Sequence, residues 1–378
     1  MSSELRLLIV DDMAMFRKII SNLAETINGV QVVGTAVNGQ DALEKIPKLK
    51  PDVITLDVEM PILDGISTLK ILSKQYPQVK VIMVSTLTHS GAQVTIKALE
   101  MGAFDFVAKP AAGTINDNVA AIRTDLISKL NLMVTQKILR STINRASLQP
   151  RSSLKPVELS RPVELSRPAG VKPVVSQIVR PTAPTGMKKK VVAIGVSTGG
   201  PNALSKIMPK FPKNMNAGIV IVQHMPPLFT KSLAERLNDL SQIEVKEAQD
   251  GDEVRPGLAL LAMGGRHMEI YRKDANQGPV LVRTTDAPPE NSCRPSVDVL
   301  FRSVSKIYGG AVVGVIMTGM GFDGAKELKI MKENGAYVIA QNEETCTVFG
   351  MPKRPIEEGY TDAILPLDDI PAQIMKLI

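Results

Sequence analysis

The sequence predicts two α/β domains, each built on a mostly parallel sheet, with a linker rich in proline and arginine between them. Two observations predict this fold. Short apolar runs alternate with amphipathic stretches over residues 1–125 and again over residues 188–378. The intervening residues, 126–187, lose this alternation and become rich in proline. Continuous apolar strands that alternate with helical segments are typical of doubly wound parallel sheets.

The N-terminal domain, residues 1–125, contains five predicted strands. The runs that predict them are LRLLIV, VQVVGTA, DVITLD, VKVIMVS and FDFVAK. Between the strands, apolar residues recur at helical spacing, as at Phe16, Ile19 and Leu23. We therefore expect a five-stranded doubly wound parallel sheet, with its functional residues at the carboxyl ends of the strands.

The segment at residues 126–187 is predicted to extend the last helix and then become a linker. A helix around residues 114–143 is followed by a stretch rich in Pro, Ser and Arg, in which the hexapeptide PVELSR occurs twice, at 156–161 and 162–167. This composition is typical of an extended linker that builds no packed core.

The basic character of the chain is concentrated around this linker. The formal net charge is +7, but residues 137–190 hold twelve Lys or Arg and two acids, so that segment carries +10 and the rest carries −3. Aromatic residues make up only 3% of the chain, too few for a base-stacking surface. The charge is typical of a solvated linker, and we expect no nucleic-acid partner.

Targeting signals are missing from the sequence pattern. No apolar run approaches the length that spans a bilayer, and the N-terminal residues MSSELRLLIVDD lack the basic and apolar regions of a signal peptide. The two cysteines, Cys293 and Cys346, cannot form a disulfide framework. We expect a cytoplasmic protein that is not inserted into a membrane.

The C-terminal domain, residues 188–378, is predicted to contain a second doubly wound, mostly parallel sheet. Its strands are predicted by VVAIGV, GIVIVQH, GLALLA, AVVGVIMTG and AYVIAQ, and MEIYR with PVLVRTT predicts a hairpin.

Charged residues stand at three strand ends of the N-terminal domain. Asp11 and Asp12 follow the first strand, Asp57 ends the third, and Lys109 ends the fifth. A single Asp at a strand end is usually a helix N-cap. Three carboxylates that converge on one edge of the sheet instead favour a hard divalent cation such as Mg²⁺, and a carboxylate oxygen can attack a phosphoryl group there.

This domain resembles the receiver domain of bacterial two-component response regulators over about residues 4–125. The resemblance rests on the Asp-Asp pair, on LDVEMPILDG after the third strand, and on MVS and FVAKP. It implies that Asp57 accepts the phosphoryl group. It also implies Asp12, Asp57 and the Glu59 carbonyl as Mg²⁺ ligands, with Asp11 acting through water.

The same resemblance implies a set of switch residues. Lys109 would contact the phosphoryl group, and Ser85 would be the switch hydroxyl, with Thr86 as the alternative. Phe106 occupies the switch aromatic position. A chemotaxis histidine kinase is the implied phosphodonor.

The C-terminal domain places a serine, a histidine and an aspartate at three strand-end loops. Ser197 lies in the turn GVSTGG directly after a strand, His224 ends the next strand, and Asp323 lies in the turn GMGFDG. A helix N-terminus after the serine favours a developing oxyanion. We therefore expect acyl transfer with Ser197 as nucleophile, His224 as base and Asp323 as the residue that orients the base.

Three alternatives compete for Ser197. The turn could hold a dinucleotide phosphate, but that fold expects an acid after the next strand, where Gln223 and His224 stand. It could be an α/β-hydrolase elbow, but that fold orders its triad Ser, acid, His, and no His follows Asp323. It could also cap a helix, which is the commonest role of such a serine. His267, in a Gly-Gly-Arg-His turn, is interpreted as a structural or solvated residue.

Residues 188–378 resemble the chemotaxis protein-glutamate methylesterase family. The carrying motifs are IGVSTGGP, IVQHMP, CRPSVDVLFRS and MTGMGFDG. The resemblance implies the same triad and an oxyanion hole that includes the backbone N–H of Met320, with Thr198 nearby. Arg294 and residues 296–298 would line the substrate side, although Ser296 and Asp298 could instead be helix N-caps.

The implied function is the hydrolysis of glutamyl methyl esters on methyl-accepting chemotaxis receptors, together with deamidation of receptor glutamines. Asp57 phosphorylation would control access to Ser197, and the enzyme would reset receptor sensitivity. Mg²⁺ would serve receiver phosphorylation only, and the esterase chemistry would use no cofactor. The alternative is a phosphorylation-switched binding or DNA-binding regulator whose output domain is catalytically inactive.

Overall fold

The computed structural model describes residues 4–109, 115–147, 190–273 and 278–378. Most of the predicted linker, including both copies of the hexapeptide repeat, lies outside the described residues. Among the helices of the described ranges, none is both long enough and apolar enough to cross a membrane.

The N-terminal domain is a five-stranded parallel sheet with the strand order β2-β1-β3-β4-β5. The predicted fold of this domain is confirmed. Its elements are β1 (Leu5–Val10), α1 (Ala14–Glu25), β2 (Val30–Ala36), α2 (Gly39–Leu49), β3 (Val53–Asp57), α3 (Gly65–Gln75), β4 (Lys80–Thr86), α4 (His89–Glu100), β5 (Asp105–Lys109) and α5 (Ile115–Ser147).

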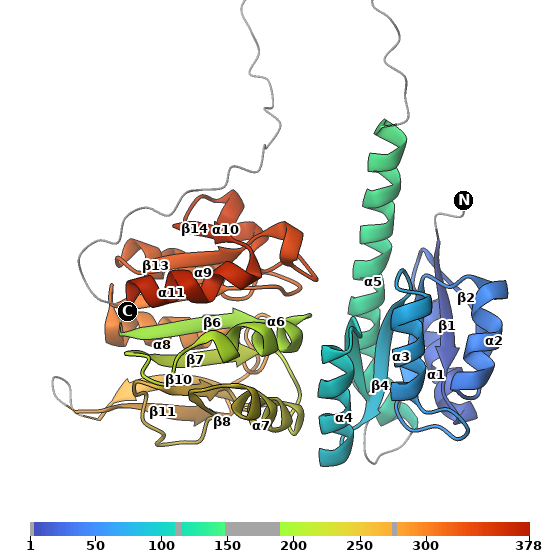
Figure 1. The fold of residues 1–378 in the computed structure, drawn as a ribbon, viewed down its shortest axis with the longest axis horizontal. Coiled ribbons are helices and arrows are strands. Elements are labelled where there is room, and N and C mark those ends of the chain that lie inside the picture. The colour runs from blue at the N-terminus through green and yellow to red at the C-terminus, as the bar shows by residue number, and fades with distance from the viewer. Residues whose placement is uncertain (1–3, 110–114, 148–189, 274–277) are drawn as a thin grey trace, which may run out of the picture.

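Helices cover both faces of this sheet (Figure 1). The packing of the β1 side chains explains why the strands are apolar throughout. Leu7 and Ile9 pack with α1 and α5 on one face. Leu8 and Val10 pack with α2, α3 and α4 on the other. Because successive side chains of a strand point to opposite faces, a strand that is buried on both sides needs an unbroken apolar run.

The C-terminal domain has a seven-stranded, fully parallel sheet in the order β14-β13-β12-β6-β7-β9-β8, and a separate antiparallel hairpin of β10 and β11. The predicted doubly wound fold is confirmed. Its strands are β6 (Val191–Val196), β7 (Gly218–Gln223), β8 (Glu244–Glu247), β9 (Leu258–Leu261), β10 (His267–Arg272), β11 (Val280–Thr285), β12 (Val312–Ile316), β13 (Tyr337–Gln341) and β14 (Ala363–Leu365).

Two layers of helices enclose this sheet. Helices α6, α7 and α11 pack on one face, and α8 and α9 pack on the other together with the hairpin. The helices and 3₁₀ turns are α6 (Gly200–Ile207), η1 (Met208–Lys210), α7 (Phe229–Leu240), α8 (Val297–Tyr308), α9 (Ala325–Glu333), η2 (Glu343–Thr345), α10 (Lys353–Glu357), η3 (Leu367–Asp369) and α11 (Ile370–Leu377).

The direction of the strand connections reverses at the end of β6. The chain leaves β6 for β7 on one side, whereas β12 pairs with β6 on the other. At such a reversal, the loops after two neighbouring strands lead to opposite faces of the sheet. Open α/β sheets usually bind their ligands between these loops, at the carboxyl ends of the strands. The turn that contains Ser197 follows β6 at this point.

The two domains contact each other along α4, which packs against α6 and α7 (Figure 1). The rings of Phe106 on β5 and Phe229 on α7 are stacked, with centroids 4.4 Å apart. The Arg236 guanidinium on α7 donates two hydrogen bonds to the Glu100 carboxylate on α4, both of 2.9 Å. The Ser205 hydroxyl of α6 also donates to Glu100 at 3.2 Å, and His89 Nε2 of α4 lies 3.5 Å from the Glu235 carboxylate of α7. An apolar stack and several polar contacts therefore join the domains.

We predict that Phe211→Ala destabilises the C-terminal domain by about 3–5 kcal/mol, because Phe211 is fully buried beneath the sheet and its loss leaves a cavity. Urea unfolding followed by circular dichroism measures the change. Phe322→Ala is the matched control, since that ring is 55% exposed. A loss below about 1 kcal/mol for Phe211→Ala would contradict the packing described here.

Candidate functional site

Ser197 is held between the ends of three adjacent strands. Its backbone N–H donates to the carbonyl of Thr318, which follows β12, at 3.0 Å. Its carbonyl accepts from the Gln223 side-chain amide, at the end of β7, at 3.0 Å. Because Val196 and Gln223 are partners in the β6–β7 register, Ser197 and His224 follow equivalent positions of neighbouring strands.

Glycine is required at two positions around this serine. Gly199, the N-cap of α6, has a φ of +79°, in the left-handed region that glycine adopts without strain. At Gly319, a Cβ would lie 2.8 Å from the Cβ of Ser197 and 2.3 Å from the sulfur of Met351. The glycine-rich turns that the sequence places at these strand ends therefore let the backbone pass close to the serine.

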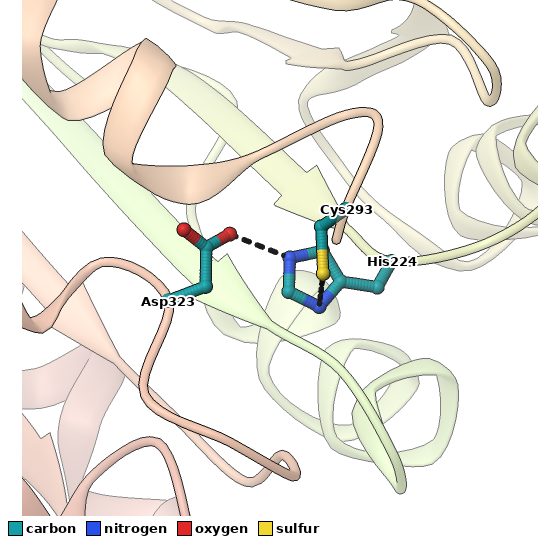
Figure 2. Close-up of side chains that lie close together, drawn as sticks. All are labelled: His224, Cys293 and Asp323. Atoms are coloured by element: carbon teal, nitrogen blue, oxygen red, sulfur yellow. Dashed lines mark hydrogen bonds and ion pairs between the residues drawn. The ribbon is translucent and has the colours of Figure 1, made fainter. Parts of the chain in front are cut away.

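His224 and Asp323 form a hydrogen-bonded pair (Figure 2). The imidazole Nε2 lies 2.8 Å from the Asp323 carboxylate Oδ2. The same carboxylate accepts hydrogen bonds from the backbone N–H of Val297 at 2.6 Å, the Ser296 hydroxyl at 2.9 Å and the Asn291 amide at 2.7 Å. Asp323 thus caps the N-terminus of α8, where the helix dipole favours a negative charge.

These contacts shift the pKa values of both partners in the directions expected of an ion pair. Burial alone would lower the pKa of His224, but the hydrogen bond to Asp323 and the nearby Cys293 raise it to about 9. Burial alone would raise the pKa of Asp323, but the hydrogen bond and charge of His224 and the N–H of Val297 outweigh it, and the pKa is lowered. The Asp323 carboxylate therefore stabilises the imidazolium that forms when His224 accepts a proton, and only the unprotonated ring can act as a base.

The second ring nitrogen of His224 faces Cys293. The Cys293 sulfur lies 3.7 Å from Nδ1 (Figure 2). Among the described residues, the Ser197 hydroxyl makes no hydrogen bond to His224. Because Nε2 is bound to Asp323, Nδ1 is the nitrogen left to accept a proton from a nucleophile.

Two residues of this site, Asn291 and Cys293, were assigned no role by the sequence analysis. Asn291 has a φ of +53° and donates to both Asp298 and Asp323, at 2.8 and 2.7 Å. Asn adopts left-handed backbone more readily than most residues, which is the one local signal in the sequence. Asn291 and Cys293 lie near His224 and Asp323 because of how α8 packs against the turn after β12. No local sequence pattern predicts that packing.

Two backbone N–H groups near Ser197 are available to a ligand. Those of Thr198 and Met320 donate to no other described residue. The Met320 side chain packs against the apolar cluster of α1 and α5 in the N-terminal domain, a cluster that also contains the buried Val348. The loops around the serine therefore contact the other domain.

The residues expected on the substrate side divide into two groups. Arg294 is exposed, and its guanidinium donates to the carbonyl of Asp286 at 3.2 Å. Ser296 and Asp298 are buried, and both donate to Asp323, through the Ser296 hydroxyl at 2.9 Å and the Asp298 N–H at 3.2 Å. These two residues support the carboxylate rather than capping α8 with their own side chains.

His267 is buried away from the His224 pair. Its Nε2 lies 3.1 Å from the carbonyl of Pro288, and its Nδ1 accepts the N–H of Ser296 at 3.2 Å. Both ring nitrogens therefore have backbone partners, and the side chain is buried rather than solvated.

The N-terminal domain brings its predicted charged residues together. The Lys109 ammonium lies 2.8 Å from Asp11 and 2.7 Å from Asp57, and all three side chains are buried. Burial raises the pKa of Asp57 to about 6, although the Lys109 charge lowers it, and the Asp11 charge adds to the rise. Two buried carboxylates thus share one ammonium.

An exposed third carboxylate completes this cluster. Asp12 contributes an oxygen, and one oxygen from each of Asp11, Asp12 and Asp57 lies within 4.8 Å of the others. Asp12 and Glu59 line the same surface hollow of about 600 Å³. A set of carboxylate oxygens beside an open hollow fits Mg²⁺, which prefers oxygen ligands and keeps several waters.

The predicted switch residues lie on the two strands beyond β3. Ser85 is buried, and its hydroxyl donates to the Gly91 carbonyl at 3.2 Å. Thr86, the alternative, is half-buried with its Oγ1 3.3 Å from that of Thr88. Phe106 is the ring that stacks on the C-terminal domain.

Comparisons with known proteins match both domains. Residues 192–374 match the CheB methylesterase family, and residues 7–120 match the response regulator receiver domain. Two proteins named protein-glutamate methylesterase/protein-glutamine glutaminase, from Desulfotalea psychrophila and Archaeoglobus fulgidus, are 43% and 40% identical to the chain. Each alignment covers 99% of this chain and 98% of the relative.

The chain belongs to the protein-glutamate methylesterase family. Among solved structures, the catalytic domain of the Thermotoga maritima CheB methylesterase is 47% identical, with a TM-score of 0.48, and the match covers 51% of this chain and all of that one. The family models and the full-length relatives confirm the resemblance drawn from the sequence and the prediction of a hydrolase with a response regulator receiver domain. The roles of individual site residues stay predictions.

We predict that His224 of this methylesterase titrates near pH 9. The Asp323 anion stabilises the imidazolium, so Asp323→Asn should lower the pKa of His224 by at least about one unit. Nuclear magnetic resonance of the imidazole nitrogens across pH 5–10 measures it. Asp368→Asn, at an exposed carboxylate bound to Lys210, is the control. An unchanged His224 pKa in Asp323→Asn would contradict the ion pair.

Proposed function

We propose that this chain hydrolyses the methyl esters of glutamyl side chains by a Ser-His-Asp mechanism. The observation that carries the proposal is the 2.8 Å pair of His224 and Asp323 beside the turn of Ser197, at the carboxyl ends of the neighbouring strands β6, β7 and β12. The names of the full-length relatives support the substrate class. Membership of the protein-glutamate methylesterase family also disfavours the alternative of a regulator whose output domain is catalytically inactive.

In the proposed reaction, Ser197 attacks the ester carbonyl while its proton passes to Nδ1 of His224. Asp323 holds the ring through Nε2 and stabilises the imidazolium that forms. The imidazolium then protonates the leaving methoxide, and methanol departs. Water attacks the acyl-enzyme by the same proton route, which frees the glutamate. A glutamine amide would react in the same way, with ammonia as the leaving group.

The oxyanion of this reaction would lie near the free N–H groups of Met320 and Thr198. Both belong to the turns that flank Ser197, and Thr198 directly precedes the N-cap of α6. Preorganised donors aimed at a developing negative charge are usually the largest catalytic contribution.

The proposed substrates are methyl-accepting chemotaxis receptors, and the proposed phosphodonor is a chemotaxis histidine kinase. The receiver domain supports a kinase as partner, because such domains accept phosphoryl groups from one. Removal of methyl groups from receptors would reset their sensitivity. The proposed location is the cytoplasm, where the kinase and the receptor tails would meet the enzyme.

Asp57 is the proposed phosphoryl acceptor. One of its carboxylate oxygens would bond to the phosphorus as the donor group leaves, and Lys109, 2.7 Å away, would balance the added charge. Asp11, Asp12 and Asp57, with the carbonyl of Glu59, would hold a Mg²⁺ ion that screens the phosphoryl oxygens. The esterase site would need no metal for its chemistry.

Phosphorylation would control the esterase by changing how the domains dock. Met320 and Val348, on loops beside Ser197, pack against the N-terminal domain, and α4 covers α6 and α7. In this docked form the N-terminal domain would restrict the approach of a protein substrate to Ser197. Ser197 also lacks its hydrogen bond to His224 here, which supports a resting state for the docked form. Separation of the domains would then both expose and rearrange the site.

We predict that Ser197→Ala, His224→Ala and Asp323→Ala each lower the turnover of methylated receptor by about a thousandfold or more, since triad members act as a unit. Methanol release measures it. His267→Ala is the control and should keep much of the turnover per folded molecule, because His267 contacts only the backbone. Near-normal turnover by His224→Ala would overturn the assignment of the base.

We predict that acetyl phosphate labels the chain at Asp57 only when Mg²⁺ is present, and that Asp57→Asn abolishes labelling. The buried carboxylates otherwise hold only one ammonium between them. Mass spectrometry of the intact protein detects the adduct. Asp368→Asn, at an exposed carboxylate of the C-terminal domain bound to Lys210, is the control. Labelling of Asp57→Asn at the normal rate would refute the site.

We predict that Arg236→Glu raises the unphosphorylated turnover about two- to fivefold, because it replaces an ion pair with Glu100 by a repulsion across the interface. Adding Glu100→Arg should restore an ion pair and return turnover toward the normal level. The turnover of residues 188–378 alone gives the upper limit of this increase. If neither Arg236→Glu nor the isolated domain exceeds the intact chain, docking does not inhibit.

A further inference from the structure

Three side chains that commonly ligate metals meet at the esterase site. One nitrogen, sulfur or oxygen atom from each of His224, Cys293 and Asp323 lies within 4.8 Å of the others. The proposed esterase reaction uses His224 and Asp323 but gives Cys293 no task. The combination of a thiol with an imidazole differs from the all-oxygen set of the N-terminal domain, and it favours a softer cation than Mg²⁺.

We infer that His224 Nδ1 and Cys293 Sγ form a binding site for Zn²⁺, or a divalent cation of similar softness, that blocks the catalytic base when occupied. The inference rests on the proposed function for the role of His224, but the binding itself does not. The two protein ligands would leave the remaining positions of the cation to water.

The separation of the two ligand atoms suits a shared zinc ion. Zinc binds thiolate sulfur at about 2.3 Å and imidazole nitrogen at about 2.0–2.1 Å in tetrahedral sites, which places the two ligand atoms about 3.6 Å apart. The observed distance from Sγ to Nδ1 is 3.7 Å. The separation of the two atoms therefore matches a shared ion. Figure 2 shows the sulfur in front of the imidazole ring, so the thiol side chain would swing toward the ring plane to share an ion with Nδ1.

The other ring nitrogen of His224, Nε2, already makes the hydrogen bond that is typical of a zinc-binding histidine. A histidine that ligates zinc usually donates its second ring N–H to a carboxylate, which fixes the tautomer and the ring orientation. Here Nε2 lies 2.8 Å from the Asp323 carboxylate. Asp323 is in turn held by Val297, Ser296 and Asn291, so the ring is fixed before any cation arrives.

A cation can reach this pair from solvent. His224 and Cys293 are half-buried, and the neighbouring Asn291, Ser292 and Arg294 are exposed. On binding, the thiol would release its proton to solvent and become a thiolate ligand. A protonated imidazole would release its Nδ1 proton as well, so that the Nδ1 lone pair can bind the cation. Because that lone pair is the one that must accept the Ser197 proton, occupancy and catalysis exclude each other.

Binding is tested on the full chain with Co²⁺ as the probe, in excess Mg²⁺ to occupy the N-terminal site. A thiolate ligand gives Co²⁺ an intense near-ultraviolet charge-transfer absorption that oxygen ligands do not. We expect the band in the unmodified chain and in Cys346→Ser, the other half-buried cysteine, and its loss in Cys293→Ser. Zn²⁺ should displace the Co²⁺ and remove the band.

Inhibition is tested by titrating Zn²⁺ against methanol release, with each variant referred to its own metal-free rate. Cys293→Ser should raise the half-inhibiting Zn²⁺ concentration at least about tenfold, and Cys346→Ser should leave it unchanged. No band in the unmodified chain, or a band that survives Cys293→Ser, would overturn the site. If Cys293→Ser loses the Co²⁺ band but is inhibited by Zn²⁺ as strongly as the unmodified chain, the cation does not inhibit by blocking His224. A chain with no esterase activity would refute the proposed function, while the Co²⁺ band would still decide the site.

Discussion

The esterase site depends on how one buried carboxylate is held. Asp323 would be costly to bury as an anion, but it accepts hydrogen bonds from the N-terminus of α8, from Ser296 and Asn291, and from His224. These donors keep it ionised and fixed. The fixed carboxylate holds the ring of His224 through Nε2 and leaves Nδ1 beside Cys293. The positions of α8 and the turn after β12 thus determine which nitrogen serves the nucleophile.

Much of this arrangement can be predicted from the sequence, because its parts are local. Asp11, Asp57, Ser197 and His224 each follow an apolar run, and parallel strands bring such positions to one edge. The edge strand β8 was missed because Val245 is its only apolar residue, and β14 was missed because it is only three residues long. The contact of Cys293 with His224 was missed for another reason. It joins segments 69 residues apart through the packing of α8, and no periodicity or turn signal records that distance.

The receiver and the esterase site are connected through β5. Lys109, which pairs with Asp57, and Phe106, which stacks on Phe229, lie on this strand three residues apart. Lys129 of α5 donates to the Phe106 carbonyl and pairs with Asp125, so the backbone beside the stacked ring is anchored to a helix as well. A new charge at Asp57 would draw Lys109 toward it, and the strand would transmit that shift to the ring at the interface without any change in the C-terminal domain.

The strength of the interface limits what such a shift can achieve. An aromatic stack contributes about 0.5–1.5 kcal/mol beyond its buried area, and a partly exposed ion pair such as Arg236 with Glu100 about 0–1 kcal/mol. Loss of both would change the docking equilibrium by about 0.5–2.5 kcal/mol, whereas a shift from 1% to 99% open needs about 5.5 kcal/mol. Complete opening therefore also requires the apolar packing of α4 against α6 and α7 to be lost. Phosphorylation would then change the fraction of undocked molecules by degrees. The size of that change would depend on how much of the α4 packing phosphorylation disrupts.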